Sequence, residues 1–394
     1  MRESRRAGIP PFYVMEVFKR AHARDLVTGD VLHLEVGQPS TPAPVLVRDE
    51  AARVLLTDRL GYTNALGIDE LRDRIAAHYA TRHRVDVPPG RIAVTVGASG
   101  GMVLALLAAF DGGGRVGITE PGYAAYRNIV SALDLELVGV RVGPETRYVP
   151  TPELLDAAGP LDGLVVASPS NPTGTQLTAA ELAGVAGWCE RADVVLLMDE
   201  IYHGISFTEP APSILEFTDR AIVLQSFSKY FSMTGWRVGW LVLPEELVPG
   251  LERLAQNLFI CPPALAQRAA VAAFDATDEL DGNVARYKES RAMLVEALDQ
   301  WGLPHAPPDG AFYFWVDVSS LGDSRRVADE WLDQVGVAVT PGIDFDPSQG
   351  HRYIRLSYSE EPDDIARAIE RLDTLLGRRG AIEGRSGPAP ASGS

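Results

Sequence analysis

The chain has 394 residues, of which 46% are hydrophobic and 23% charged, so disorder of the whole chain is excluded. Lysine and arginine number 36 against 53 aspartate and glutamate residues, a formal net charge of −17. This acidic balance, with no basic stripe, argues against a nucleic acid or a membrane surface as partner.

The cellular location of the protein and the redox state of its cysteines are predicted from features that the sequence lacks. No apolar run reaches the ~20 residues that span a bilayer, and two prolines stand where a signal-peptide core would begin. The two cysteines, Cys189 and Cys261, lie far apart and form no CxxC motif. We therefore predict a cytoplasmic protein without disulfides.

Short apolar runs alternate with amphipathic stretches of helical length through the first part of the chain. Seven strands are predicted, at residues 92–96, 115–119, 136–141, 163–167, 194–198, 221–224 and 238–242. Helical patterns separate most of them, for example at residues 102–110, 123–133 and 179–191. Because most of the runs are apolar throughout, they indicate an α/β fold with a mostly parallel sheet covered by helices on both faces.

From about Glu245 the pattern becomes helical and then mixed. Helices are predicted at 264–274, 283–301, 324–335 and 362–376, and strands at 311–316 and 353–357. This pattern favours a second, smaller α+β domain that residues near the N-terminus complete. We expect an N-terminal arm at 1–45, a large domain at 46–290, a small domain at 291–377 and a disordered tail, rich in small residues, at 378–394.

Two glycine-rich segments resemble phosphate-binding or catalytic motifs. Residues 112–117 fit GxGxxG but precede a predicted strand, so we interpret them as a connection and not as a dinucleotide site. Residues 97–101 fit GxSxG and follow a strand, the context of a hydrolase nucleophile such as Ser99, with Asp199 and His203 or His351 as partners. The same context suits a phosphate held by backbone N–H groups at the start of a helix.

A lysine follows the predicted strand 221–224, in the sequence Ser-Phe-Ser-Lys that ends at Lys229. Only three of the 36 basic residues are lysines, so a retained lysine points weakly to a need for an amine. Desolvation at the end of a buried strand lowers the pKa of an amine, which suits Schiff-base chemistry. Arg237, eight residues later, is a natural partner for a phosphate.

The stretch around Lys229 resembles the lysine signature of the class I/II aminotransferases, which are fold-type I pyridoxal-phosphate enzymes. The matching residues are Ser226, Phe227, Ser228, Lys229, Ser232, Met233, Gly235, Arg237, Val238 and Gly239. Further landmarks of the family follow in order from Gly37 to Arg355. The resemblance implies a large cofactor-binding domain, pyridoxal 5'-phosphate as cofactor, and ping-pong transfer of an amino group between an L-amino acid and a 2-oxo acid.

The resemblance also implies roles for single residues. Lys229 would hold the cofactor and move the substrate proton, Asp199 would pair with the pyridine nitrogen, and Arg355 would clamp the substrate carboxylate. The other implied contacts are Tyr202 and Asn171 at the phenolate oxygen, Tyr123 on the ring, Ala98, Ser99, Ser226 and Arg237 at the phosphate, and Gly37 and Asn171 beside the substrate. Tyr62 would reach the phosphate of a partner subunit, which implies a homodimer. We expect no metal site, because the histidines show no ligand spacing.

Three alternatives remain open from the sequence. A carbon–sulfur β-lyase of the same fold keeps nearly all of these residues. A serine hydrolase explains Ser99 but leaves Lys229, Arg237 and Arg355 without a role. A cofactor-sensing regulator would need a DNA-binding domain ahead of the resemblance, for which we expect no room.

The kind of substrate side chain is predicted from the absence of a cation that could bind a second substrate carboxylate. A lysine that reads a distal carboxylate in some family members is absent from residues 98–101, and residues 258–261 are apolar. Phe12 and Tyr13 are expected to line the same pocket from the N-terminal arm. We therefore expect a neutral apolar or aromatic donor, with 2-oxoglutarate or pyruvate as acceptor.

Overall fold

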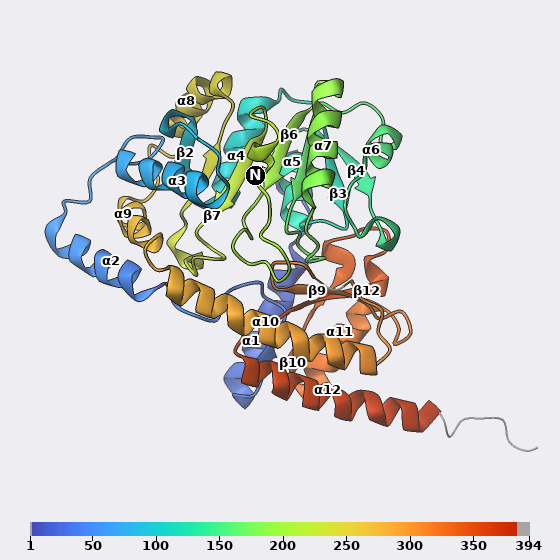
Figure 1. Cartoon of the computed structure of the whole chain (residues 1–394). Coiled ribbons are helices and arrows are strands. Elements are labelled where there is room, and N and C mark those ends of the chain that lie inside the picture. Colours follow the sequence, from blue (N-terminus) through green and yellow to red (C-terminus); the bar gives the residue numbers. More distant parts are fainter. Residues whose placement is uncertain (1, 307, 384–394) are drawn as a thin grey trace, which may run out of the picture.

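The computed structural model describes residues 2–306 and 308–383, with side chains through residue 377. A seven-stranded sheet enclosed by helices lies above a smaller unit that contains a three-stranded sheet (Figure 1). This arrangement confirms the predicted α/β fold class. Within the described residues, no helix is both long and apolar enough to cross a membrane.

The large sheet has the strand order β2-β8-β7-β6-β5-β3-β4. Its strands are β2 (Ile92–Thr95), β3 (Arg115–Glu120), β4 (Glu136–Arg141), β5 (Gly163–Ala167), β6 (Val195–Asp199), β7 (Ile222–Ser226) and β8 (Gly239–Val242). Only β8 runs antiparallel to its neighbours, and β6 pairs in parallel with both β5 and β7. All seven strands were predicted, with ends within two residues, because most of them are buried on both faces and are therefore apolar throughout.

Helices cover both faces of this sheet. One face packs on α4 (Gly97–Ala109), α5 (Ala124–Ala132) and α8 (Val248–Leu258). The other packs on α3 (Asp69–Arg82), α6 (Pro152–Ala157), α7 (Ala179–Ala192) and α9 (Ala264–Ala273), while α2 (Val45–Thr57) packs on α9. Neighbouring strand residues such as Leu196 and Leu197 belong to the two different clusters, as the two-residue period of a strand requires.

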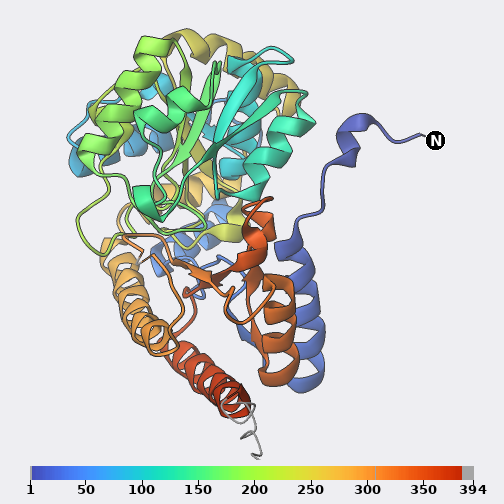
Figure 2. The same cartoon turned by 90° about the vertical axis from the view of Figure 1, so that its right-hand side faces the viewer.

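The smaller unit is formed by segments from both the N-terminal and the C-terminal parts of the described chain. Its antiparallel sheet has the order β11 (Thr340–Pro341), β12 (Tyr353–Ser357) and β9 (Tyr313–Asp317). Strand β1 (Leu32–His33) pairs with β10 (Val337–Ala338), so the N-terminal segment does complete this unit. Helices α1 (Tyr13–Thr28), α10 (Thr277–Gln300), α11 (Ser324–Val335) and α12 (Pro362–Glu383) surround it, as Figure 2 shows from the side.

Three helix ends differ from the prediction. Helix α4 begins at Gly97 and not at residue 102, because its first turn, Ala-Ser-Gly-Gly, lacks hydrophobic periodicity. Helix α10 begins six residues early and runs through residue 290, where we expected a domain boundary. Helix α12 reaches Glu383, so residues 378–383 of the expected disordered tail are helical, and residues 384–394 lie outside the described residues. The division into domains stays a prediction.

Short 3₁₀ helices connect these elements. Their bounds are η1 (Arg5–Gly8), η2 (Pro89–Arg91), η3 (Pro144–Thr146), η4 (Ile214–Glu216), η5 (Thr234–Trp236), η6 (Glu245–Leu247), η7 (Gly342–Asp344) and η8 (Gly350–Arg352).

Candidate active site

The carboxyl ends of the parallel strands meet at the edge of the large sheet that faces the smaller unit (Figure 1). A cavity of about 600 Å³ lies there, and α/β sheets bind ligands at this edge. Eleven of the twelve predicted site residues line it: Gly37, Ala98, Ser99, Tyr123, Asn171, Asp199, Tyr202, Ser226, Lys229, Arg237 and Arg355. The twelfth, Tyr62, lies elsewhere, on the loop between α2 and α3, and its side chain is 84% exposed.

Lys229 follows β7 and places its amine inside the cavity. Its Nζ donates a hydrogen bond to the carbonyl oxygen of Gly37 (2.6 Å) and lies 5.8 Å from the centre of the Tyr202 ring. Burial, assisted by the nearby charge of Arg355, lowers the pKa of this amine to about 8. A larger neutral fraction near pH 7 makes Lys229 a better nucleophile and base than an exposed lysine.

Asp199 ends β6 and is a buried carboxylate. Its Oδ1 accepts a hydrogen bond from the backbone N–H of Ile201 (3.0 Å), and its Oδ2 accepts one from the Tyr126 hydroxyl. Burial raises the pKa of Asp199 to about 6, while both hydrogen bonds and the Lys229 charge oppose the rise. The carboxylate is therefore ionised at neutral pH and is available to pair with a cationic ring nitrogen.

Backbone N–H groups and a guanidinium meet at the start of α4. Gly97 has a positive φ of 65°, and a Cβ there would collide with the Arg237 guanidinium. The Nη1 of Arg237 donates to the carbonyl oxygen of Thr234 (2.9 Å), and the hydroxyl of Ser226 lies at the adjacent end of β7. A helix N-terminus beside an arginine favours a bound phosphate.

Arg355 lies on β12 of the smaller unit and lines the cavity from there. Its guanidinium donates to Oδ1 of Asn171 (3.1 Å) and to the carbonyl oxygen of Glu35. The ring centres of Tyr313 and Phe345 lie 4.6 Å and 4.8 Å from its Cζ. Its buried Nε has no hydrogen-bond partner among the described residues. A ligand carboxylate would satisfy this donor and balance the charge.

Two tyrosines of the site were missed from the sequence. Tyr126 binds Asp199, and Tyr313 shares a hydrogen bond with the hydroxyl of Tyr202 (2.8 Å). Tyr126 lies in the first turn of α5, three residues after its N-cap residue Tyr123, and this short spacing from a predicted site residue was the available signal. Tyr313 had no local signal beyond its place in a predicted strand.

The lining residues carry few charges. Lys229, Arg237 and Arg355 are the cations among them, and Asp199 is the one carboxylate. Such a cavity attracts anions although the whole chain is strongly acidic. Part of the wall is apolar and consists of Phe12, Val14, Met15, Val36, Met102, Ile129 and Ile201.

One residue expected in this wall does not belong to it. Phe12 lines the cavity, but Tyr13 does not, because its ring lies against Arg325 at 5.0 Å.

The hydrolase interpretation of Ser99 is wrong. No histidine is among the residues that line the cavity. The Nε2 of His203 contacts the carbonyl oxygen of Ser168 (3.1 Å), and His351 is exposed on η8. Ser99 therefore lies in the first turn of α4 without the histidine partner that the hydrolase interpretation requires, among the described residues that line the cavity.

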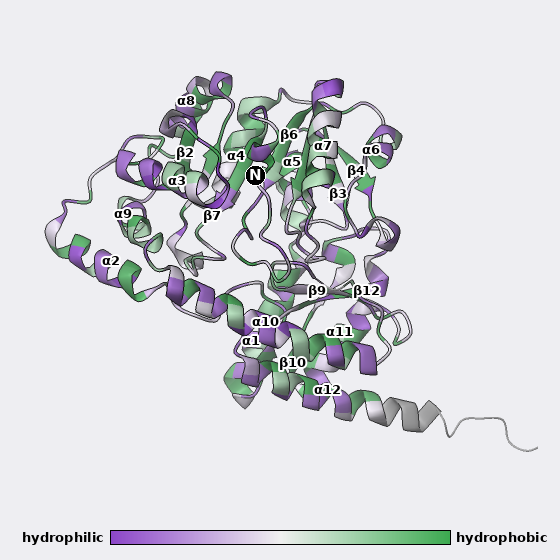
Figure 3. Cartoon of the chain, viewed as in Figure 1, coloured by the Kyte–Doolittle hydropathy of each residue, from purple (hydrophilic) through white to green (hydrophobic). Residues whose placement is uncertain are grey.

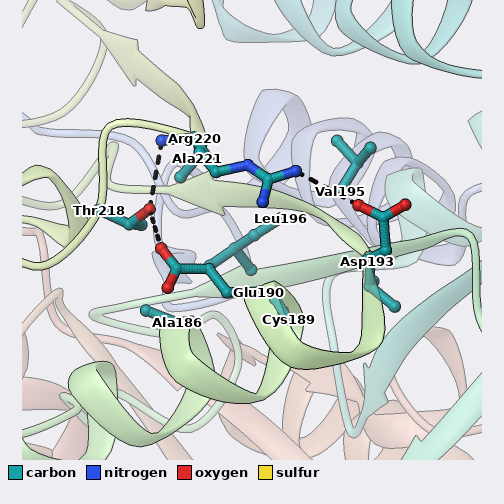
Figure 4. Close-up of a pocket in the computed structure, with 10 residues that line it drawn as sticks. Ala186, Cys189, Glu190, Asp193, Val195, Leu196, Thr218, Arg220 and Ala221 are labelled. Carbon is teal, nitrogen blue, oxygen red and sulfur yellow. Dashed lines mark hydrogen bonds and ion pairs between the residues drawn. The ribbon is translucent and has the colours of Figure 1, made fainter.

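A second, much smaller cavity of about 60 Å³ lies where β6 and β7 begin, away from the predicted site residues (Figure 4). Its polar groups are already paired. The hydroxyl of Thr218 donates to Glu190 (2.7 Å), and Arg220 forms an ion pair with Asp193 (3.3 Å). The thiol of Cys189, which also lines this cavity, is free, but burial raises its pKa to about 12 and so disfavours the reactive thiolate.

Comparisons with known proteins agree with this geometry. The model of the family described as aminotransferase class I and II matches residues 29–372. The valine–pyruvate aminotransferase of Mycobacterium tuberculosis is 48% identical over 378 residues, which covers 94% of this chain and 97% of that protein.

Solved structures are similar over almost their whole length. A crystal structure of an aminotransferase from Mycobacterium tuberculosis has a TM-score of 0.94 at 47% identity, covering 96% of this chain and 100% of the other. The aspartate aminotransferase of Thermus thermophilus with maleate has a TM-score of 0.90 at 30% identity, covering 95% and 100%.

Proposed function

This chain belongs to the class I and II aminotransferases, and from that premise we propose that its cavity binds pyridoxal phosphate and a neutral, apolar amino acid. It is an enzyme that transfers an amino group between an amino acid and a 2-oxo acid. Members of this family use pyridoxal phosphate, and the binding of that cofactor by these particular residues is part of our proposal.

The residues of the cavity fit this cofactor. The start of α4 with Arg237 suits a phosphate, buried Asp199 suits a protonated ring nitrogen, and Lys229 offers an amine of lowered pKa. Tyr123 offers an aromatic face beside this group. When bound, pyridoxal phosphate supplies an electron sink for the electron pair left as a bond to the substrate Cα breaks.

Each residue of this chain then has a task. Ala98, Ser99, Ser226 and Arg237 hold the phosphate, Tyr202 and Asn171 hold the phenolate oxygen, and Asp199 holds the ring nitrogen. Arg355 and the backbone at Gly37 orient the substrate carboxylate. The Nζ of Lys229 would take the proton from the substrate Cα as general base and would give it up again as general acid.

The shortage of cations carries the substrate assignment. Once Lys229, Arg237 and Arg355 have these tasks, no cation is left among the described lining residues to form an ion pair with a second, distal carboxylate. The remaining wall, including Phe12 and Ile129, is apolar, which favours an aliphatic or aromatic side chain. A relative described as a valine–pyruvate aminotransferase supports the same choice of donor and favours pyruvate as acceptor. We keep 2-oxoglutarate as the other candidate acceptor.

The test is a donor series with the purified holoenzyme. We expect kcat/KM for valine to exceed that for aspartate at least tenfold, about 1.4 kcal/mol of discrimination. A preference for aspartate would overturn the assignment. The same assay without a 2-oxo acid checks the β-lyase alternative, because a lyase releases ammonia and pyruvate from a cysteine conjugate without an acceptor.

We also propose a homodimer that completes the site. A further cavity of about 730 Å³, lined by residues such as Thr41 and Trp236, shares Gln38, Thr234 and Gly235 with the active-site cavity. Apolar side chains are exposed on the neighbouring helix α2 and at the end of α8. Figure 3 shows hydrophobic and hydrophilic residues alternating along the ribbon of α2. A second copy on this face would cover them and bring its exposed Tyr62 to the phosphate.

The cytoplasmic location also stays a proposal. Cys189 and Cys261 are both free thiols, as a reducing compartment requires.

A further inference from the structure

Helix α1 begins without a cap of its own. The residue in the N-cap position is Phe12, whose side chain accepts no hydrogen bond. The first N–H groups of a helix have no acceptor within the helix and need one from elsewhere. Here Asp344, which ends η7, supplies the acceptors for the first two N–H groups of the helix. Its Oδ1 accepts a hydrogen bond from the N–H of Tyr13 (3.1 Å), and its Oδ2 accepts one from the N–H of Val14 (2.8 Å).

The missing cap has a consequence for the cavity. Serine, threonine, aspartate or asparagine usually occupies the N-cap position. In this chain that position holds a phenylalanine, which lines the cavity and packs edge-on against Tyr123 with ring centres 5.8 Å apart. Val14 and Met15, in the first turn of α1, line the cavity as well. Capping by Asp344, which is only 4% exposed, therefore leaves the arm free to present apolar side chains.

The turn that carries Asp344 is also attached to the other walls. The ring of Phe345 lies against the guanidinium of Arg355. The carbonyl oxygen of Phe345 accepts a hydrogen bond from the N–H of Gly122 (3.0 Å), the residue before Tyr123. The carbonyl oxygen of Asp344 accepts from Arg127 of α5. One turn thus ties together the N-terminal arm, the carboxylate-binding arginine and the Tyr123 loop.

We propose that Asp344 is a specificity-determining positioning residue that holds the apolar wall of Phe12, Val14 and Met15 at a set distance from Arg355. This inference rests on the proposed function, because Arg355 fixes the substrate carboxylate and the wall then meets its side chain. A branched aliphatic side chain such as that of valine buries more apolar area against this wall than the methyl group of alanine. Loosening the arm therefore weakens the use of valine more than the use of alanine.

The test compares Asp344→Asn with Asp346→Asn as a matched control. Asparagine keeps the size of Asp344 but turns an N–H₂ donor toward one of the two helix N–H groups. Asp346 is equally buried and also accepts backbone N–H groups, those of Ser348 and Gln349, but it contacts Arg141 and not the arm.

For Asp344→Asn we expect the valine-to-alanine ratio of kcat/KM to fall at least fivefold, mainly through the KM for valine. The affinity for pyridoxal phosphate should change less than twofold. Hydrogen exchange of the cofactor-free protein should become faster at the start of α1, and Asp346→Asn should leave the ratio and this exchange unchanged. A further variant, Phe12→Ser, places a capping serine at the N-cap position but removes the phenyl ring from the cavity wall. It should lower the valine-to-alanine ratio of kcat/KM without making hydrogen exchange at the start of α1 faster.

The proposal is overturned if the valine-to-alanine ratio of kcat/KM in Asp344→Asn stays within twofold of the native value. It is overturned as well if the variant lowers kcat/KM equally for both donors and also lowers the affinity for the cofactor. It is also overturned if Asp346→Asn changes the ratio by the same amount. Failure of the unaltered enzyme to use either donor would overturn the proposed function first, and the exchange measurement would still decide whether Asp344 holds the arm.

Discussion

Replacing Tyr126 by phenylalanine removes a single hydroxyl from the buried carboxylate of the site. In the native chain this hydroxyl donates to Oδ2 of Asp199, and the backbone N–H of Ile201 donates to Oδ1. Both side chains are buried, so water does not replace the lost donor. The ionised form of Asp199 loses stabilisation in the variant, whereas its protonated form does not depend on that donor.

The size of the effect follows from the charge on Asp199. A hydrogen bond to a charged group contributes about 1.5–3 kcal/mol. At 1.36 kcal/mol per unit this corresponds to roughly one to two pKa units. Burial already raises the pKa of Asp199 to about 6, so the variant should have a pKa of about 7–8 by the same arithmetic. The raised pKa favours the protonated acid, and the ion pair with a cofactor nitrogen is therefore lost as the pH falls.

The assay is titration of the cofactor-free proteins with pyridoxal phosphate, followed by absorbance between pH 5 and 9. The ratio of wild-type to variant affinity cancels the titration of Lys229, which both proteins share. We expect a ratio near one at about pH 9, about two to ten at pH 7, and about ten to a hundred at pH 5. Tyr79→Phe is the matched control, because the hydroxyl of buried Tyr79 contacts Trp240 and not Asp199. A ratio independent of pH would refute the reasoning.

Three further predictions concern the amine, the carboxylate clamp and the second subunit. Since burial lowers the pKa of Lys229 to about 8, the rate at which pyridoxal phosphate attaches to the cofactor-free enzyme should rise through about pH 8; a midpoint near 10.5 in stopped-flow absorbance would contradict this. Arg355→Lys removes the planar fork for the carboxylate, so the KM for the amino acid should rise roughly tenfold to a hundredfold (about 1.5–3 kcal/mol) with an unchanged cofactor spectrum, and an unchanged KM would refute the role. Tyr62→Phe should weaken cofactor retention in dialysis, and a fully active monomer in sedimentation at assay concentration would show that the site needs no partner.

Local features of the sequence were enough for the sheet, whereas most residues of the candidate site were predicted from the resemblance to the family. Strands β5 and β12 have the predicted ends, because an apolar run of strand length indicates burial, and the ends of the less buried edge strand β4 were also predicted. Lys229 was predicted from its place after a strand within a recognisable motif, and Asp199, at the end of another strand, was predicted from the resemblance to the family. The polar first turns of α4 and α10 show no such periodicity, and their starts were missed.

Contacts between distant segments were decided by the tertiary structure alone. Asp344 caps a helix that begins 331 residues earlier in the chain, and Tyr313 meets Tyr202 across 111 residues. A hydrophobic pattern indicates which residues of a segment are buried and whether the segment is a helix or a strand. It does not indicate which side chains of other elements will contact that segment. The sequence therefore determined the elements and the chemistry at the ends of the strands. Packing of the smaller unit against the sheet edge determined which groups orient that chemistry, because only there do the polar groups of the two units find their partners.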